Sequence, residues 1–142
     1  MSHHSLNCTW KEGMAFESEI SGHKIVMDAD ESVGGEDTGP RPKPLLLASL
    51  AGCSGMDVVS ILKKMQQPHT YFNIDVEAEV TEEHPKHYSA IKLIYEFKKS
   101  DNLDEKKVEK AVNLSQERYC GVSALLKKAI NVDYEIRYIE HE

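Results

Sequence analysis

Two cysteines lie in apolar, helix-like segments of the chain and are 67 positions apart. Cys53 occurs in Leu-Ala-Gly-Cys-Ser-Gly-Met-Asp and Cys120 in Arg-Tyr-Cys-Gly-Val-Ser. A thiol can act as a nucleophile, as a redox centre or as a metal ligand when its thiolate is stabilised and accessible. Two such thiols suggest redox chemistry, although sequence spacing alone cannot bring them together.

The local surroundings of the two cysteines differ. Cys120 lies at the expected start of a helix, two residues after Arg118, so the helix dipole and a guanidinium could both lower its pKa. Cys53 lies about two turns inside a long helix, where the dipole has little effect. Local reasoning therefore favours Cys120 as the more acidic thiol. The alternative is that each cysteine is a small buried hydrophobic residue, which is common for free cysteines.

Metal and cofactor motifs are missing from the sequence. It contains no Cys-x-x-Cys, no His-x-x-x-His, no Gly-rich phosphate loop, no Gly-x-Ser-x-Gly elbow and no dinucleotide-binding fingerprint. We therefore expect neither a metal site nor a cofactor. Asp57, one turn after Cys53 on the same helix face, is a possible hydrogen-bond partner inside the helix, and a contact to neighbouring backbone is an equal alternative.

Composition limits the class of protein. The length of 142 residues fits one domain, spanning 1–142, and the odd number of three cysteines argues against a disulfide framework and for a reducing cytoplasm. Cys8, near the N-terminus, is expected to be a bystander. The net charge of −7, with arginine only at positions 41, 118 and 137, argues against nucleic-acid binding.

No targeting or membrane segment is expected. The first residues lack a basic region followed by an apolar run, so they do not predict a secretory signal. Residues 45–62 are long enough to span a bilayer, but they contain Asp57, two glycines and three serines. That composition favours a buried helix of a soluble protein.

Apolar periodicity predicts an α+β domain with antiparallel sheet, in the order ββαββααβ. A β-hairpin is expected first, then an irregular linker rich in Asp, Glu, Gly and Pro, then a long central helix that is apolar almost all round. A long hairpin, two helices and a last strand follow. The expected ranges are 14–20 and 25–27 for the first hairpin, 28–42 for the linker, 45–65 for the helix, 74–80 and 91–97 for the second hairpin, a helix after 101, a short helix over 119–129 and a strand over 132–138.

The two cysteine segments, in this order and at this separation, resemble the OsmC/Ohr family. The resemblance rests on Pro-x-x-Leu-Leu-Leu-Ala-Ser-Leu-Ala-Gly-Cys-Ser-Gly-Met-Asp-Val-Val-Ser-Ile-Leu and on Ala-Val-x-Leu-Ser-x-x-x-Tyr-Cys-Gly-Val-Ser, and it covers nearly the whole chain. The runs Asp-Val-Val-Ser-Ile-Leu and Leu-Ser-x-x-x-Tyr-Cys are most similar to the YhfA-type OsmC-like proteins.

The resemblance implies a fold, an assembly and a reaction. The fold would be an intertwined homodimer in which antiparallel sheets wrap two long central helices. The reaction would be thiol-dependent reduction of organic hydroperoxides or hydrogen peroxide in oxidative stress defence, by a peroxiredoxin-type oxidoreductase. Cys53 would attack the peroxide, Cys120 would resolve the sulfenic acid as a disulfide, and a dihydrolipoyl protein or a small thiol would reduce that disulfide.

The family site also holds the thiolate with an arginine and a glutamate, and here the sequence departs from the pattern. Lys43 and Pro44 stand where the acidic residue is expected, nine or ten positions before Cys53. Arg41 and Glu36 are the expected replacements, with Arg118 and Asp37 as second choices. The alternative function is an OsmC-like dimer without peroxidase turnover, which binds a small apolar ligand at the interface.

Overall fold

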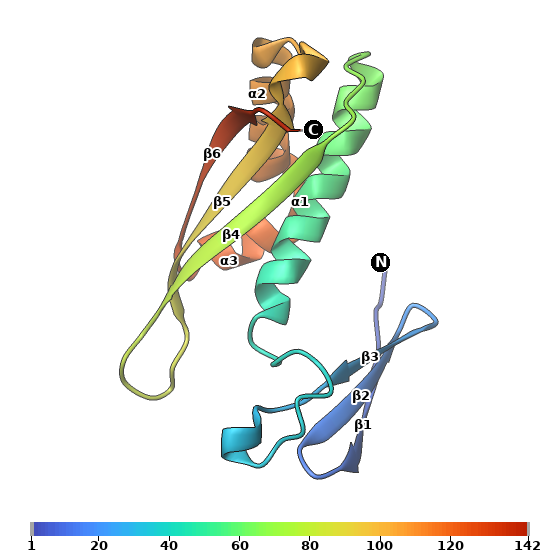
Figure 1. Ribbon diagram of the computed structural model, residues 1–142, viewed down its shortest axis with the longest axis vertical. Helices are drawn as coiled ribbons and strands as arrows, with labels where there is room; N and C mark the ends of the chain where they lie inside the picture. The colour runs from blue at the N-terminus through green and yellow to red at the C-terminus, as the bar shows by residue number, and fades with distance from the viewer. Residues whose placement is uncertain (1, 142) are drawn as a thin grey trace. The chain divides into compact units, whose positions relative to one another are not determined.

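The computed structural model describes residues 2–141, which form two compact units: one ends at Leu47 and the other begins at Ala48. The prediction of a single domain over 1–142 stays a prediction. Figure 1 shows the secondary structure of both units.

The first unit contains a three-stranded antiparallel sheet in the order β1-β2-β3. The sequence predicted the hairpin of β2 and β3, whose turn at Ser21 and Gly22 has two positive φ angles, 52° and 80°. It missed β1, because that strand is exposed along its whole length and shows no apolar alternation. The strands are β1 Asn7–Glu12, β2 Ala15–Ile20 and β3 His23–Met27.

The segment after β3 is irregular, as predicted, apart from the short 3₁₀ helix η1 (Glu31–Val33), but it is internally hydrogen-bonded. The buried Asp28 carboxylate accepts the N–H groups of Ala29, Glu36 and Thr38 at 2.7–3.2 Å and the Thr38 hydroxyl at 2.6 Å. The Thr38 hydroxyl, followed by these backbone N–H groups, lowers the pKa of Asp28 to about 2. At Gly39 a Cβ atom would lie 2.2 Å from the Val26 carbonyl oxygen, so only glycine fits there.

The second unit contains most of α1 and a three-stranded sheet in the order β4-β5-β6. The long helix and both hairpin strands are confirmed with shifts of a few residues. The predicted α+β class is confirmed, and three of the four strand pairs that the structure describes are antiparallel as predicted. The exception is β6, which pairs parallel with β5 after the crossover through two helices. The elements are α1 Leu45–Lys64, β4 Phe72–Val80, β5 Tyr88–Lys98, η2 Lys99–Asp101, α2 Glu105–Leu114, a π-helical turn η3 Ser115–Tyr119, α3 Gly121–Lys127 and β6 Asn131–Ile139.

One face of this sheet carries the core. Alternate residues of the central strand β5 are buried there and meet α1 and α2, which pack on the same face (Figure 1). Asp104 begins α2 by accepting the N–H groups of Lys106 and Lys107. The largest buried apolar residues of the unit are Leu50, Val58, Leu62, Leu93, Ile94, Tyr95, Phe97, Val108 and Val112.

Within one chain, the central helix α1 is buried along one stripe. Only Leu50, Ser54, Val58 and Leu62, spaced four residues apart, are buried, whereas Met56 is 77% exposed and Val59 43%. Within the described residues, α1 is the one helix whose length and mean hydropathy of 1.8 would allow it to cross a membrane. An interface helix of a globular assembly has the same properties.

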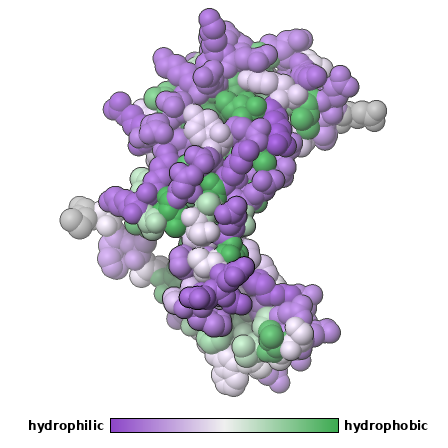
Figure 2. Space-filling model, turned by 90° about the vertical axis from the view of Figure 1, so that its left-hand side faces the viewer, coloured by the Kyte–Doolittle hydropathy of each residue, from purple (hydrophilic) through white to green (hydrophobic). Residues whose placement is uncertain are grey.

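One face of the molecule is mainly polar (Figure 2). On the face shown in Figure 2 hydrophilic residues predominate, with hydrophobic ones showing between them. This agrees with a chain in which charged residues make up 29% of the sequence.

Candidate functional site

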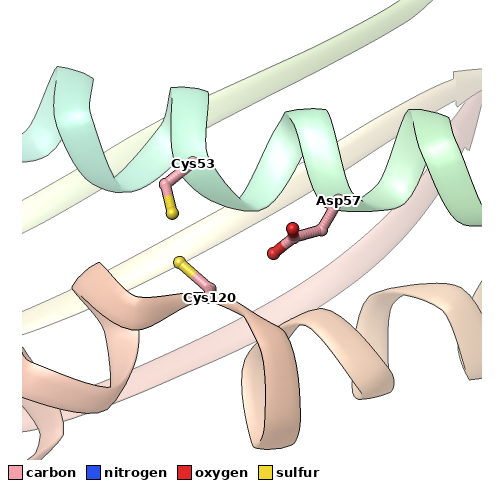
Figure 3. A group of neighbouring side chains, drawn as sticks. All are labelled: Cys53, Asp57 and Cys120. Atoms are coloured by element: carbon pink, nitrogen blue, oxygen red, sulfur yellow. The ribbon is translucent and has the colours of Figure 1, made fainter. Parts of the chain in front are cut away.

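The structure brings the two cysteine segments together. The sulfur atoms of Cys53 and Cys120 and a carboxylate oxygen of Asp57 all lie within 4.8 Å of one another. Cys53 and Asp57 point from α1 toward Cys120, which lies just before α3 (Figure 3). Cys120 is only 2% exposed, whereas Cys53 and Asp57 are half-buried. The two cysteines are not joined by a disulfide, and all three cysteines of the chain are free.

The position of each thiol follows from its local backbone. Cys53 and Asp57 are four residues apart in α1, so both side chains lie on one face of the helix. Cys120 ends the π-helical turn η3, where its N–H donates to the Ser115 carbonyl oxygen at 2.8 Å. It is also the N-cap of α3, because its sulfur accepts the Ser123 N–H at 3.4 Å. The turn and the cap together aim the Cys120 sulfur at α1.

A chain of buried hydrogen bonds connects the two segments beneath the thiols. The Gln116 amide N–H donates to the Tyr95 hydroxyl at 2.6 Å, and the Ser115 hydroxyl donates to the Asp57 carboxylate at 3.0 Å. Between these ends, the Ser54 hydroxyl is bonded to Tyr95 and, at 2.8 Å, to Ser115. Since an amide N–H only donates and a carboxylate only accepts, every hydroxyl in this chain donates toward Asp57.

Two further bonds extend this network toward α3. The Ser123 hydroxyl donates to the Gln116 side-chain oxygen at 2.7 Å, and the Lys127 ammonium donates to the Gln116 carbonyl oxygen at 2.8 Å. The nitrogen and the oxygen of the Gln116 side-chain amide therefore each have a hydrogen-bond partner. Together these bonds hold α1, β5 and the Cys120 segment in one arrangement.

Sequence reasoning missed most of this network. Ser54 and Ser115 fell within the motifs quoted for the family, but they were given no role. A usable signal was present, because Leu50, Ser54 and Val58 share one helix stripe at four-residue spacing. A serine on a buried stripe needs a hydrogen-bond partner, which predicts polar residues on the elements that pack against it.

The expectation that Cys120 is an acidic thiol is wrong. Burial raises its pKa to about 11, the Ser123 N–H opposes this rise, and the neighbouring Cys53 adds to it. The Arg118 guanidinium, two residues earlier, lies over the Tyr119 ring, 5.6 Å from the centroid. At neutral pH Cys120 is therefore a protonated thiol.

The remaining predicted residues lie in the first unit. Arg41 donates to Asp37 at 2.8 Å, to Asp30 at 3.3 Å and to the Gly39 carbonyl oxygen at 3.0 Å, and these carboxylates raise its pKa. Glu36 is exposed there and donates its backbone N–H to Asp28. The catalytic roles of Arg41 and Glu36 stay predictions. Cys8 is exposed on β1.

A groove of about 690 Å³ runs along the exposed side of α1 and the start of β4. Gly55 lies at its base, where a Cβ atom would meet the Ile74 side chain at 3.2 Å, so the small residue lets helix and strand approach closely. Met56, Val59 and Phe72 provide much of its apolar lining. The groove therefore combines an apolar wall with an exposed helix face.

Comparison with known proteins identifies the family. The family model described as OsmC-like protein matches residues 34–135. Protein YhfA of Escherichia coli (strain K12) is 38% identical over 130 residues, which cover 89% of this chain and 93% of YhfA.

Solved structures agree with this match. A hypothetical protein from Aquifex aeolicus VF5 has a TM-score of 0.81 and 33% identity, over 99% of this chain and 100% of that one. The organic hydroperoxide resistance protein OhrB of Bacillus subtilis shares the fold, with a TM-score of 0.66 and 16% identity, over 93% of this chain and 96% of that one. The chain therefore belongs to the family of OsmC-like proteins and is related to YhfA.

Proposed function

We propose that the protein is a thiol-dependent hydroperoxide reductase that uses Cys53 and Cys120 as a two-cysteine pair. The observation that carries this proposal is the convergence of the two sulfur atoms within 4.8 Å, although 67 residues separate them in sequence. A disulfide requires the sulfurs to approach to about 2.05 Å. The remaining distance is short enough for side-chain rotation and a small backbone shift, so a reversible disulfide is within reach.

The proposed reaction begins at Cys53, the more exposed of the two thiols. Its thiolate attacks the terminal oxygen of a hydroperoxide ROOH, the O–O bond breaks, and the products are a Cys53 sulfenic acid and the alcohol ROH after protonation. Cys53 loses two electrons and the peroxide gains them. The similar Bacillus subtilis protein is named as an organic hydroperoxide resistance protein, and this name supports a hydroperoxide as the substrate. The Aquifex aeolicus protein is described only as hypothetical.

The second step uses Cys120. Its sulfur attacks the Cys53 sulfenic acid, the S–O bond breaks, a disulfide forms, and the hydroxyl leaves as water. A resolving cysteine does not need to be ionised at rest, so the raised pKa of Cys120 fits this role better than the role of first nucleophile. Asp57, beside both sulfurs, is positioned to accept the Cys120 proton, and a dithiol or two small thiols then reduce the disulfide.

We also propose that two chains form a homodimer in the cytoplasm through the exposed face of α1. Only 22% of the apolar window of this helix is buried within the chain. Met56 and Val59 are exposed apolar residues on this helix that a second α1 would cover, and obligate dimers divide their core in this way. Arg41 and Glu36 are proposed to support the Cys53 thiolate.

A second candidate is a dimer that binds a small apolar ligand without turnover. The observation that favours it is the groove beside α1, whose volume of about 690 Å³ suits a small molecule. Such a protein would be stabilised by the ligand and would keep its thiols when a peroxide is added.

Peroxide consumption separates the two candidates. Purified protein is mixed with cumene hydroperoxide and excess dithiothreitol, and peroxide loss is followed against a reaction without protein. Wild type and Cys8→Ser are expected to consume many equivalents per chain, Cys53→Ser none, and Cys120→Ser far less than wild type. Consumption by Cys53→Ser at the wild-type rate would exclude the proposed mechanism.

A further inference from the structure

Cys53, Asp57 and Cys120 offer three metal ligands from two separate segments of the chain. Each contributes one donor atom, two sulfurs and one carboxylate oxygen, and all three atoms lie within 4.8 Å of one another (Figure 3). The absence of short-spaced ligand motifs led to the expectation of no metal site. That reasoning could not see a site assembled by tertiary packing across 67 residues of sequence.

The dimensions fit a tetrahedral metal ion. Zinc is bound by thiolate at about 2.3 Å and by carboxylate at about 2.0–2.2 Å, which places tetrahedral ligand atoms roughly 3.6–3.8 Å apart. From within 4.8 Å, the three donors need to close by at most roughly 1.2 Å. The Cys53 and Asp57 donors come from one helix face, and the Cys120 donor faces them from the start of α3.

Hydrogen bonds around the donors hold them in a suitable orientation. The Ser115 hydroxyl binds one Asp57 oxygen at 3.0 Å and leaves the other oxygen free to coordinate. The Ser123 N–H binds the Cys120 sulfur at 3.4 Å, as is common for metal-bound thiolates. Both Ser115 and Ser123 are fully buried, so these outer contacts are fixed by packing.

We propose that the reduced protein binds one Zn²⁺ per chain through Cys53, Cys120 and Asp57. Two sulfurs and one hard oxygen make a donor set that zinc, a metal of intermediate softness, accepts readily. The ion replaces the two thiol protons, which pass to the buffer, and the fourth position is open to water because Cys53 is half-exposed. The site does not depend on the proposed peroxide reaction.

Zinc and peroxide would then compete for the same sulfurs. With the metal bound, both thiolate sulfurs are coordinated, so the disulfide forms only as the metal is released. Oxidation of the loaded site by a hydroperoxide takes two electrons from the thiolates, consumes two protons, yields ROH, water and the disulfide, and releases Zn²⁺. Bound Zn²⁺ and the Cys53–Cys120 disulfide therefore exclude each other in one chain.

Cobalt provides the optical probe for this site. Reduced, metal-free protein is titrated anaerobically with Co²⁺, and thiolate-to-cobalt charge transfer is read in the near ultraviolet. Wild type is expected to saturate at one Co²⁺ per chain, and stoichiometric Zn²⁺ is expected to abolish the absorbance. Cys53→Ser and Cys120→Ser should each lose about half of the charge-transfer intensity or more. Asp57→Asn should keep the bands but bind at least about tenfold more weakly.

Cys8→Ser is the matched control, because Cys8 is exposed on β1 and lies near His3 and His4 in sequence. It is expected to bind cobalt as wild type does. Charge transfer that disappears in Cys8→Ser, or that survives in the double variant of Cys53 and Cys120, would overturn the assignment.

X-ray absorption on zinc-loaded wild type gives a readout that needs no variant. Two sulfur neighbours at about 2.3 Å and oxygen neighbours at about 2.0 Å are expected. A shell of oxygen and nitrogen alone would overturn the proposal. The peroxide reaction is absent from both measurements, so failure here leaves the proposed function untouched, and loss of peroxide turnover leaves the zinc site untouched.

Discussion

Removal of the Tyr95 hydroxyl tests the buried network beneath the thiols. The Tyr95→Phe substitution keeps the ring, which is fully buried and packs edge-on to Tyr134 with centroids 6.0 Å apart. It deletes the hydroxyl that lies between Gln116 and Ser54 in the network. Burial raises the pKa of Tyr95, so at neutral pH the wild-type group is a hydroxyl that both accepts and donates.

The expected loss of stability follows from which groups keep a partner. Ser54 loses its hydrogen bond to Tyr95 but retains the one to Ser115. The loss at Ser54 is therefore that of one ordinary hydrogen bond, about 0.5–1.5 kcal/mol. The Gln116 amide is left 3.5 Å from the Ser54 hydroxyl, at the limit of hydrogen bonding, and a buried donor without a good partner costs about 1–3 kcal/mol. We therefore expect Tyr95→Phe to lower the free energy of unfolding by about 1.5–4.5 kcal/mol.

Urea unfolding at one fixed protein concentration measures this change, with an unchanged denaturant slope as the sign that only stability has changed. Tyr138→Phe is the matched control, because Tyr138 lies on β6 of the same sheet and its hydroxyl forms no hydrogen bond with the residues that the structure describes. Its effect should stay within about 0.5 kcal/mol. A Tyr95→Phe protein as stable as this control would refute the network as a source of stability.

Three other predictions concern other parts of the chain. Asp104→Ala removes the N-cap of α2 and should lower the free energy of unfolding in urea by about 0.5–2 kcal/mol. Asp104→Asn should keep most of that stability, because asparagine is also a good N-cap. Equal losses of stability in the two variants would contradict the capping role. The pKa of Asp28 is lowered from 3.8 in the unfolded chain to about 2 in the folded chain, so its contribution to the stability of this segment is complete above pH 3.8 and is lost as the pH falls toward 2. Wild type should therefore lose protection from pepsin at residues 28–38 in that pH interval. Asp28→Asn should lack this pH dependence. Met56→Glu places a charge on the exposed face of α1 and should convert the proposed dimer to monomer. Sedimentation velocity at micromolar concentration measures this change, and Lys64→Glu should leave the dimer intact. A monomeric wild type would contradict the proposed dimer.

The fold could be predicted where the apolar pattern repeats over several residues. The alternation along β4 and β5 and the long apolar stretch of α1 predicted those elements to within a few residues. The pattern failed for β1, since Asn7–Glu12 is exposed throughout and is specified by its pairing with β2. It also failed for the direction of β6, because alternation along a strand is the same in parallel and antiparallel pairs.

The candidate site could be predicted only in part. The sequence singled out Cys53, Cys120 and Asp57, and the structure brings all three together. The sequence around Cys120 predicted a lowered pKa, but the pKa is raised. Burial of the thiol, and not its position at the start of α3, has the largest effect. Gln116 and Tyr95 could not be connected from sequence, since their contact depends on how α2 leads into η3 over the sheet.

The free-thiol count and intact mass after one equivalent of an organic hydroperoxide test the two-cysteine mechanism most directly. Reduced wild type and Cys8→Ser should each lose two thiols and two hydrogen atoms per chain. Cys120→Ser should retain a sulfenic acid, one oxygen heavier, that dimedone captures at Cys53, and Cys53→Ser should remain unchanged. Unchanged thiols in wild type, or a sulfenic acid that forms at Cys120 in Cys53→Ser, would contradict the mechanism.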